Sequence, residues 1–208
     1  MSAALLQTHV YDIYDRIAPE FDRTRHSPWP GVQAFLAGLP AGATVLDVGC
    51  GNGKYLSLRR DCQMFGCDPC ASLVAVAAAR ASNATVQVGN GLALPYQTGS
   101  MDAVYSIAVL HHMPTVTLRR QMLSEMRRVL RPGGTALITV WDRSAVRPSW
   151  TPMSEPGDYE VGWSSSGPRY YHVFSETEIY NLISEYFRVT EVRWERENWY
   201  VYVTRTLL

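Results

Sequence analysis

From Thr44 to Trp141 the chain alternates short apolar runs with stretches that have a helical period. The apolar runs predict five strands, at residues 44–49, 64–68, 85–89, 101–107 and 134–141. Residues 53–60, 71–81 and 118–130, which lie between them, predict helices. Regular alternation of strands and helices is typical of a mostly parallel sheet that is covered on both faces. We therefore expect an α/β fold.

The two ends of the chain have other patterns. Ser175 and Glu178 form a capping box that opens a helix, and residues 187–195 and 198–205 read as two strands joined by a turn. These predict an antiparallel hairpin at an edge of the sheet. At the other end, Tyr11, Tyr14, Ile17 and Phe21 recur at helical spacing, as a stripe that either packs on the domain or caps a pocket.

These patterns predict a single domain over residues 1–208. Its parts are an N-terminal helical cap (1–40), a ligand-binding core (41–141), a loop or lid (142–172) and a C-terminal helix with hairpin (173–208). Residues 142–168 are rich in Pro, Ser and Gly and are too long for a plain connection, so we expect a mobile lid or a binding loop there.

Composition narrows the class of protein. Apolar residues make up 47% of the 208 positions, which suits one domain with a full core. No run is long enough to span a membrane, and the first residues do not resemble a signal peptide, so we expect a cytoplasmic or nuclear protein. Four cysteines within residues 50–70 do not make a secreted disulfide framework. Cys67 and Cys70 lack further ligands at zinc spacing, so no metal is expected.

The charges balance to a formal net charge of zero, yet 18 of the 19 basic residues are arginines. Several arginines cluster, around residues 16–25, 119–131 and 188–196. Because phosphate contacts depend on local positive surface, these clusters are compatible with RNA binding, and equally with solvated helix faces.

The segment LDVGCGNGKY, residues 46–55, carries the main chemical signal. Its three glycines follow a strand and let a ligand approach the backbone at the start of the next helix. Dinucleotides and S-adenosylmethionine both use such turns. Asp47 would repel a pyrophosphate but attract the cationic amino-acid end of S-adenosylmethionine, so we favour the latter.

Two further features support this ligand. Asp68 ends the next predicted strand, where a carboxylate can accept hydrogen bonds from ribose hydroxyls. The third predicted strand runs into GNGLALPY, residues 89–96, where adenine is commonly bound in enzymes that use this cofactor.

With these motifs the chain resembles the class I, Rossmann-like S-adenosylmethionine-dependent methyltransferases. Within that class the blocks VYDIYDRIAPEFDRTRHSPWP, LDVGCGNGKYL, IAVLHHM, RYYHVF and ENWYV resemble the eukaryotic tRNA wobble-uridine carboxymethyl methyltransferases. The resemblance implies a seven-stranded sheet and esterification of 5-carboxymethyluridine at anticodon position 34. It also implies a heterodimer with a small zinc-binding activator subunit, which would add to the open edge strand at residues 85–89.

Site residues follow from the matched motifs. The resemblance implies cofactor contacts from Asp47, Gly49, Gly51, Asn52 and Asp68, with Asn90 and Gly91 near adenine; Cys50 and Ile107 complete the predicted set. Asn90 stands where the family usually has aspartate, and its amide oxygen can still accept a hydrogen bond from adenine.

The chemistry of the implied reaction suggests the remaining residues. A carboxylate acceptor is already ionised near neutral pH, so the site needs alignment rather than a general base. Arg25 and Arg169 are the candidates to hold the acceptor carboxylate, and His111, Tyr170 and His172 are candidate donors. Trp29 or Tyr170 would stack on a flipped base of the tRNA anticodon loop.

Two alternatives stay open because a fold does not determine a substrate. One is a methyltransferase acting on a small molecule. The other is a non-catalytic subunit that keeps the cofactor fold.

Overall fold

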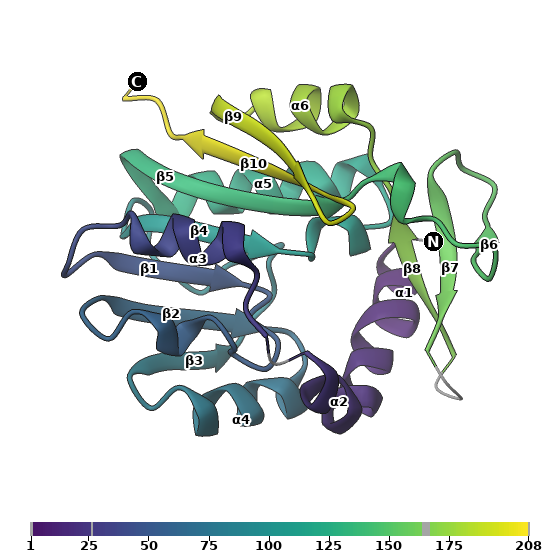
Figure 1. The fold of residues 1–208 in the computed structure, drawn as a ribbon, viewed down its shortest axis with the longest axis horizontal. Coiled ribbons are helices and arrows are strands. Elements are labelled where there is room, and N and C mark those ends of the chain that lie inside the picture. Colours follow the sequence, from purple (N-terminus) through teal and green to yellow (C-terminus); the bar gives the residue numbers. More distant parts are fainter. Residues whose placement is uncertain (1, 26, 164–166, 208) are drawn as a thin grey trace.

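A seven-stranded sheet forms the centre of the protein, in the strand order β3-β2-β1-β4-β5-β10-β9 (Figure 1). The structure is a computed structural model, and it describes residues 2–25, 27–163 and 167–207. The strands are β1 (Thr44–Val48), β2 (Gln63–Asp68), β3 (Ala84–Val88), β4 (Met101–Ile107), β5 (Leu130–Trp141), β9 (Arg188–Glu195) and β10 (Asn198–Thr204).

The first five of these strands run parallel, and β10 and β9 add an antiparallel hairpin beside β5. The predicted architecture, a mostly parallel seven-stranded sheet with a C-terminal hairpin, is therefore confirmed. The chain reverses its strand order between β1 and β4. In open sheets of this type the ligand binds at the carboxyl ends of the strands, beside that reversal.

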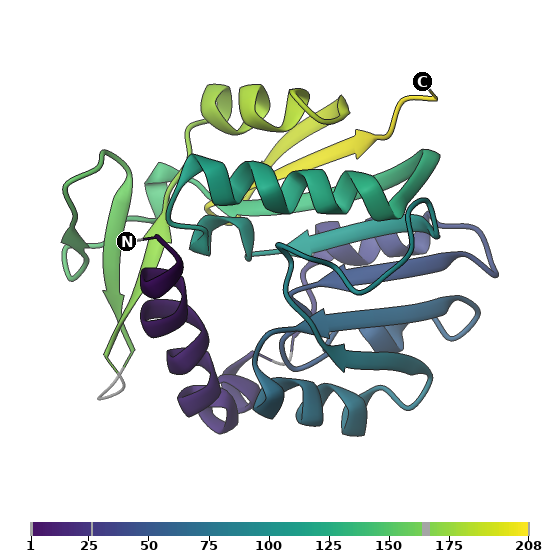
Figure 2. The same cartoon turned by 180° about the vertical axis from the view of Figure 1, so that it is seen from behind.

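Helices cover both faces of the sheet (Figures 1 and 2). One face carries α3 (Pro30–Ala37), whose Val32 and Leu36 pack on Val45 and Leu137. The other face carries α5 (Val116–Val129) and α6 (Glu176–Ser184). The side chains predicted for one face of α5 pack there, with Met122, Met126 and Val129 fully buried. The helix α4 (Ala71–Arg80) connects β2 to β3.

Two predicted elements differ in the structure. Residues 53–60 hold only a short 3-10 helix, Leu56–Leu58, because the glycine turn extends further than the apolar pattern suggests. The fifth strand was predicted at residues 134–141, but β5 begins at Leu130 and includes Pro132, Gly133 and Gly134. Gly133 adopts φ +75°, and the register of β5 against β4 shifts nearby, so the strand passes through an irregularity instead of ending.

The segment predicted as a loop or lid, residues 142–172, is largely ordered into secondary structure. After a 3-10 turn (Arg143–Ala145) it forms a second, antiparallel sheet of β6 (Thr151–Pro152), β7 (Asp158–Gly162) and β8 (Pro168–His172). Aromatic and branched residues in β7 and β8 favour this pairing. The RYYH motif is therefore a strand, and successive side chains point to opposite faces.

An N-terminal helical cap is present, but it is shorter than the predicted residues 1–40 because α3 packs on a face of the sheet. It consists of α1 (Ser2–Leu6), a π-helical turn (Gln7–Tyr11) and α2 (Asp12–Thr24). Figure 2 shows these helices running from the small sheet to α4, across the carboxyl ends of the parallel strands. A final 3-10 turn, Leu110–His112, follows β4 at the same end of the sheet. The cap and the small sheet thus enclose the end of the sheet where a ligand binds.

No helix in the described part of the chain is long and apolar enough to cross a membrane.

Candidate functional site

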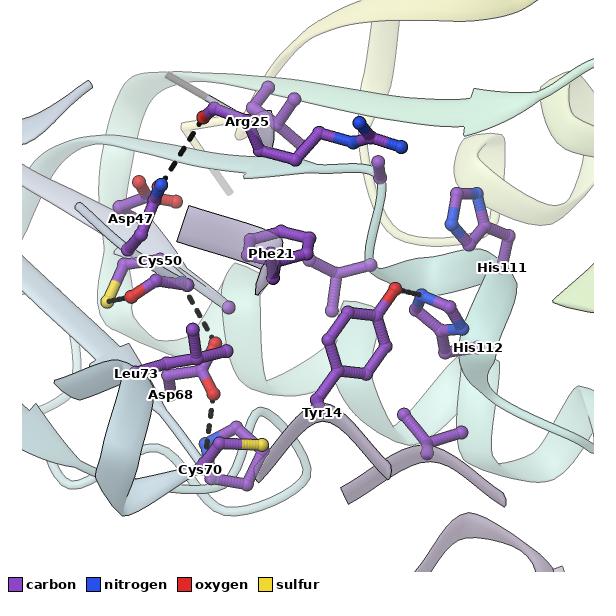
Figure 3. A pocket seen from close by; sticks show the side chains of 18 of the residues that line it. Tyr14, Phe21, Arg25, Asp47, Cys50, Asp68, Cys70, Leu73, His111 and His112 are labelled. Carbon is purple, nitrogen blue, oxygen red and sulfur yellow. Dashed lines mark hydrogen bonds between the residues drawn. The ribbon is translucent and has the colours of Figure 1, made fainter. Parts of the chain in front are cut away.

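A pocket lies at the carboxyl ends of β1, β2 and β4, beneath the N-terminal cap. Figure 3 shows two groups of polar side chains in it, Asp47 and Asp68 on one side and His111 and His112 on the other. Tyr14 and Phe21, from the cap, lie between them. The aromatic stripe of the N-terminal helix therefore lines a pocket, which was one of the two interpretations of its spacing.

The glycine turn forms the floor of the acidic side. Gly49, Gly51 and Gly53 all have positive φ, at +76°, +50° and +70°, a conformation that glycine adopts without steric cost. A Cβ atom on Gly49 would lie 2.5 Å from Val109, and one on Gly53 would lie 2.8 Å from Ala77. Side chains at these positions would collide with the packing around the turn, so the sequence needs glycine there.

Asp68 holds this turn in place. Its Oδ2 accepts a hydrogen bond from the Gly51 backbone N–H at 2.9 Å, and its Oδ1 accepts one from the Cys70 N–H, also at 2.9 Å. Burial raises the pKa of the Asp68 carboxyl, and the two amides oppose that rise. Each carboxylate oxygen keeps a lone pair with which it can accept from a ligand hydroxyl.

Asp47 differs from Asp68 because no ion pair to it occurs among the described residues. Its side chain lines the pocket and is 2% exposed. Burial raises the pKa of this carboxyl well above its usual range. A cation bound in the pocket would offset the cost of burying the charged form.

Asn52 connects the turn to the cap. Its Nδ2 donates to Asp22 Oδ1 at 2.8 Å and to the Arg25 carbonyl at 3.3 Å. Arg80 pairs with the same Asp22 at 2.5 Å. These contacts hold the end of α2, and with it the backbone of Arg25, against the glycine turn.

The other side of the pocket contains two neutral histidines whose tautomers follow from their partners. The carbonyl of Tyr170 can only accept, so His112 Nδ1 donates to it at 2.9 Å, and His112 Nε2 accepts from the Tyr14 hydroxyl at 3.0 Å. Burial lowers the pKa of His112 to about 3. His111 Nδ1 accepts from the Trp141 N–H at 3.2 Å, which leaves Nε2–H as the donor that His111 can offer. Burial also lowers the pKa of His111 well below its usual range.

Arg169 brings a positive charge into this side of the pocket. It is 4% exposed, and its Nη1 donates to the Tyr14 hydroxyl at 3.2 Å, while its Nε has no hydrogen-bond partner in the described ranges of the chain. Its Cζ lies 4.5 Å from the ring centroid of Trp163 and 5.1 Å from that of Tyr171. No carboxylate pairs with it in the described part of the chain: Asp158 binds His172, and Glu160 lies 3.9 Å from His9. A guanidinium stays charged in proteins, so this buried cation has no counter-ion among the residues that the structure describes.

The comparisons with known proteins agree with this geometry. Residues 46–138 match the family model described as a methyltransferase domain. The chain is 33% identical over 219 residues to the tRNA (carboxymethyluridine(34)-5-O)-methyltransferase of Schizosaccharomyces pombe, covering 93% of this chain and 94% of the relative. It is 50% identical over 137 residues to the mouse protein of the same name, ALKBH8, covering 66% of this chain.

The chain belongs to the tRNA (carboxymethyluridine(34)-5-O)-methyltransferase family. It spans about 20% of the length of the mouse relative and 39% of the Arabidopsis thaliana relative.

Solved structures show the same fold. An S-adenosylmethionine-dependent methyltransferase from Methanosarcina mazei superposes with a TM-score of 0.75 at 20% identity, over 88% of this chain and all of that one. A putative methyltransferase of Haloferax volcanii, in complex with the Trm112 methyltransferase activator, gives a TM-score of 0.70 at 20% identity, over 93% of this chain and 97% of that one.

Most of the residues predicted from the sequence line this pocket: Arg25, Asp47, Gly49, Cys50, Gly51, Asn52, Asp68, Ile107, His111 and Arg169. Asn90 and Gly91 do not. Asn90 Oδ1 accepts from the Leu92 N–H at 2.9 Å and from the Tyr11 hydroxyl at 3.3 Å, so it contacts the pocket wall through Tyr11. A Cβ on Gly91 would lie 3.2 Å from Val48, within the core packing.

Tyr170 and His172 were predicted as donors, but they lie outside the pocket. They face the opposite side of β8 from Arg169, where the Tyr170 hydroxyl donates to Asp158 at 2.7 Å and His172 Nδ1 contacts the same carboxylate at 2.5 Å. Strand alternation is the physical reason, because Arg169 and Tyr171 share one face of β8. Tyr170 is fully buried in this arrangement, whereas Trp29, the other residue predicted to stack on a base, does line the pocket.

Sequence reasoning missed several residues of the pocket. Tyr171 lines it and stacks on Trp141 with the ring centroids 4.4 Å apart and 6° between the planes. The two-residue spacing from Arg169 was the available signal. Lys54 also lines the pocket, with Nζ 4.8 Å from the Tyr55 ring centroid, and burial lowers its pKa to about 8. Among the described residues no group of three or more His, Cys, Asp or Glu side chains could hold a metal ion.

Proposed function

We propose that this protein transfers a methyl group from S-adenosylmethionine to the carboxylate of 5-carboxymethyluridine at the wobble position of tRNA, giving the methyl ester. The observation that carries the proposal is Arg169, a buried guanidinium in the pocket of a methyltransferase-family chain, with no counter-ion among the described residues. An anionic acceptor supplies the charge that this cation lacks. The relatives, which are named as tRNA (carboxymethyluridine(34)-5-O)-methyltransferases, suggest the identity of that acceptor.

The residues present fit the cofactor. Asp47, buried and without an ion pair in the described part of the chain, suits the cofactor's ammonium group. Asp68 has acceptor capacity left for ribose hydroxyls, and the glycines leave the turn open to close approach. When bound, S-adenosylmethionine supplies a methyl group that its sulfonium centre activates for displacement.

The chain's own contribution to the reaction is alignment. The acceptor carboxylate is ionised near neutral pH, and the lowered pKa values of His111 and His112 keep both imidazoles neutral and unsuited to take up a proton. Arg169 and Arg25 bind one edge of the carboxylate by charge-assisted hydrogen bonds, and His111 Nε2–H is a further donor. Holding the acceptor at near-attack distance supplies about 7–11 kcal/mol of the barrier in well-oriented reactions.

A small activator subunit is the proposed partner. The sheet ends at β3, whose Val88 is 56% exposed, and an open edge strand accepts another chain by strand addition. A structural neighbour was solved as a complex with the Trm112 methyltransferase activator. We propose that a zinc-binding activator of this kind binds this chain, and that the anticodon loop of tRNA is its substrate.

The proposal is tested by a methyl-transfer assay with the chain alone and with a co-expressed activator. The acceptors are an anticodon stem-loop carrying 5-carboxymethyluridine at position 34 and the same RNA with uridine there. We expect label from the cofactor in the first RNA only, released by mild base as methanol, since esters are base-labile. Absence of base-labile label from both preparations would overturn the proposed function.

A further inference from the structure

Trp163, directly after β7, connects three parts of the pocket wall. Its indole Nε1–H donates to Glu20 Oε2 on α2 at 3.0 Å. Arg169 Cζ lies over the indole ring at 4.5 Å from the centroid, and Arg25 Cζ lies over it at 5.2 Å. The two arginines that face the proposed acceptor therefore share one aromatic contact.

This arrangement brings two positively charged side chains, Arg25 and Arg169, into one pocket. Two guanidinium groups in one pocket repel each other, and a protein usually separates or neutralises such a pair with carboxylates. Neither Arg25 nor Arg169 pairs with a carboxylate among the described residues. Arg25 Nη1 donates to the Thr24 carbonyl, and Arg169 Nη1 donates to the Tyr14 hydroxyl.

An aromatic ring attracts a cation through its face and leaves the planar N–H edge of a guanidinium free. A carboxylate partner would occupy that edge and compete with the substrate. Trp163 can thus hold two arginines near each other without blocking the groups that bind an anion. The hydrogen bond to Glu20 fixes the position of the indole relative to α2, at whose end Arg25 lies.

We propose that Trp163 is a positioning residue that sets the carboxylate selectivity of the site by holding Arg25 and Arg169 together. This inference rests on the proposed function and deepens it. Trp163 acts through the two arginines and does not itself line the pocket.

The test compares two RNAs that differ only in charge. One stem-loop carries 5-carboxymethyluridine at position 34, and the other carries its neutral amide, 5-carbamoylmethyluridine. Dissociation constants are measured by fluorescence anisotropy in the presence of S-adenosylhomocysteine, for the unsubstituted chain, Trp163→Ala and Trp163→Phe. Trp194→Ala, at an indole on β9 that is 52% exposed, serves as the matched control.

We expect the unsubstituted chain and Trp194→Ala to prefer the acid over the amide. Trp163→Ala should lose about 5-fold or more of that preference, and Trp163→Phe, which keeps a ring, should lose less. Calorimetric affinity for S-adenosylhomocysteine should stay unchanged in both variants.

The failures are distinguishable. Equal binding of the two RNAs by the unsubstituted chain would overturn the proposed function. The role of Trp163 would be overturned if Trp163→Ala kept the full preference for the acid. It would also be overturned if the variant lost S-adenosylhomocysteine affinity to the same extent as it lost that preference.

Discussion

Arg169 on β8 donates from Nη1 to the hydroxyl of Tyr14 on α2 at 3.2 Å, across 155 positions of the chain. The same hydroxyl donates to His112 Nε2 at 3.0 Å and lies 3.1 Å from the Tyr171 hydroxyl. One phenol therefore joins the N-terminal cap, the small sheet and the turn after β4. The position of the unpaired cation in the pocket depends on this junction.

Tyr14→Phe tests the junction. Loss of the hydroxyl leaves His112 Nε2 without its donor, so we expect the free energy of unfolding to fall by about 1–3 kcal/mol. Because Arg169 also loses a partner, kcat/KM on the carboxylated stem-loop should fall about 10-fold, as a lost hydrogen bond of about 1.4 kcal/mol predicts. Denaturant unfolding and the methyl-transfer assay measure the two effects. Tyr180→Phe, on an exposed face of α6, is the control, and an equal effect there would refute the assignment.

Asp68 supports the cofactor turn, and its removal should weaken cofactor binding. Asp68→Ala removes the acceptor of the Gly51 and Cys70 amides, so we expect calorimetric affinity for S-adenosylhomocysteine to fall about 100-fold, the equivalent of two lost hydrogen bonds. Asp68→Asn keeps one acceptor oxygen and should lose less affinity than Asp68→Ala. Unchanged affinity in both variants would contradict the cofactor placement.

The buried His112 makes stability depend on pH in a defined direction. Its folded pKa, about 3, lies below the unfolded value near 6.5, so the unfolded chain takes up a proton that the folded chain rejects. The stability associated with the neutral imidazole is complete above pH 6.5 and is lost as the pH falls toward 3.

Burial raises the pKa values of Asp47 and Asp68, so their contribution to stability changes with pH in the direction opposite to that of His112. A variant that lacks only the histidine is therefore needed to isolate its effect. Between pH 6.5 and 5, the unsubstituted chain should lose about 1.6 kcal/mol more unfolding free energy than His112→Asn, since the slope rises from half of about 1.36 kcal/mol per pH unit at pH 6.5 to nearly that full value at pH 5. Parallel pH profiles for the two proteins would show that His112 is not held neutral.

The open edge at β3 gives a prediction about the partner. Val88→Lys places a charge on that edge and should abolish co-purification with the activator subunit, because charges on edge strands disfavour strand addition. Val116→Lys, at a valine on α5 that is 47% exposed, should leave co-purification intact. If both variants still co-purify with the activator, then the activator binds another surface.

The sequence was most informative where local chemistry constrains the backbone. The glycines at 49, 51 and 53 with Asp47 and Asp68 predicted the acidic side of the pocket, because the positive φ at each of the three glycines restricts the residue type there and Asp68 accepts two hydrogen bonds from the turn. The mostly parallel sheet followed from the alternation of elements, and the edge position of the third strand followed from the family resemblance. Local pattern is a sound guide when the ligand site is built within one βαβ unit.

The sequence was less informative where the pocket depends on tertiary contacts. Residues 142–172 show little periodicity, so their sequence predicts a loop where the structure has the small sheet. The sequence therefore did not indicate which side chains of β8 point toward the pocket. Once the motif is known to be a strand, the period of two separates Arg169 and Tyr171 from Tyr170 and His172. Trp163 gave no signal of its own, because its role depends on an arginine 138 positions earlier, Arg25, and on Arg169.

The central claim is that the buried guanidinium of Arg169 recognises the negative charge of the acceptor. The most direct measurement is the ratio of dissociation constants for the carboxymethyl and carbamoylmethyl stem-loops, in the unsubstituted chain and in Arg169→Gln. A charge-assisted hydrogen bond contributes about 1.5–3 kcal/mol, so we predict that the substitution reduces the preference for the acid about 10- to 150-fold and leaves the binding of the amide RNA nearly unchanged. A preference for the acid that persists in Arg169→Gln would contradict the account.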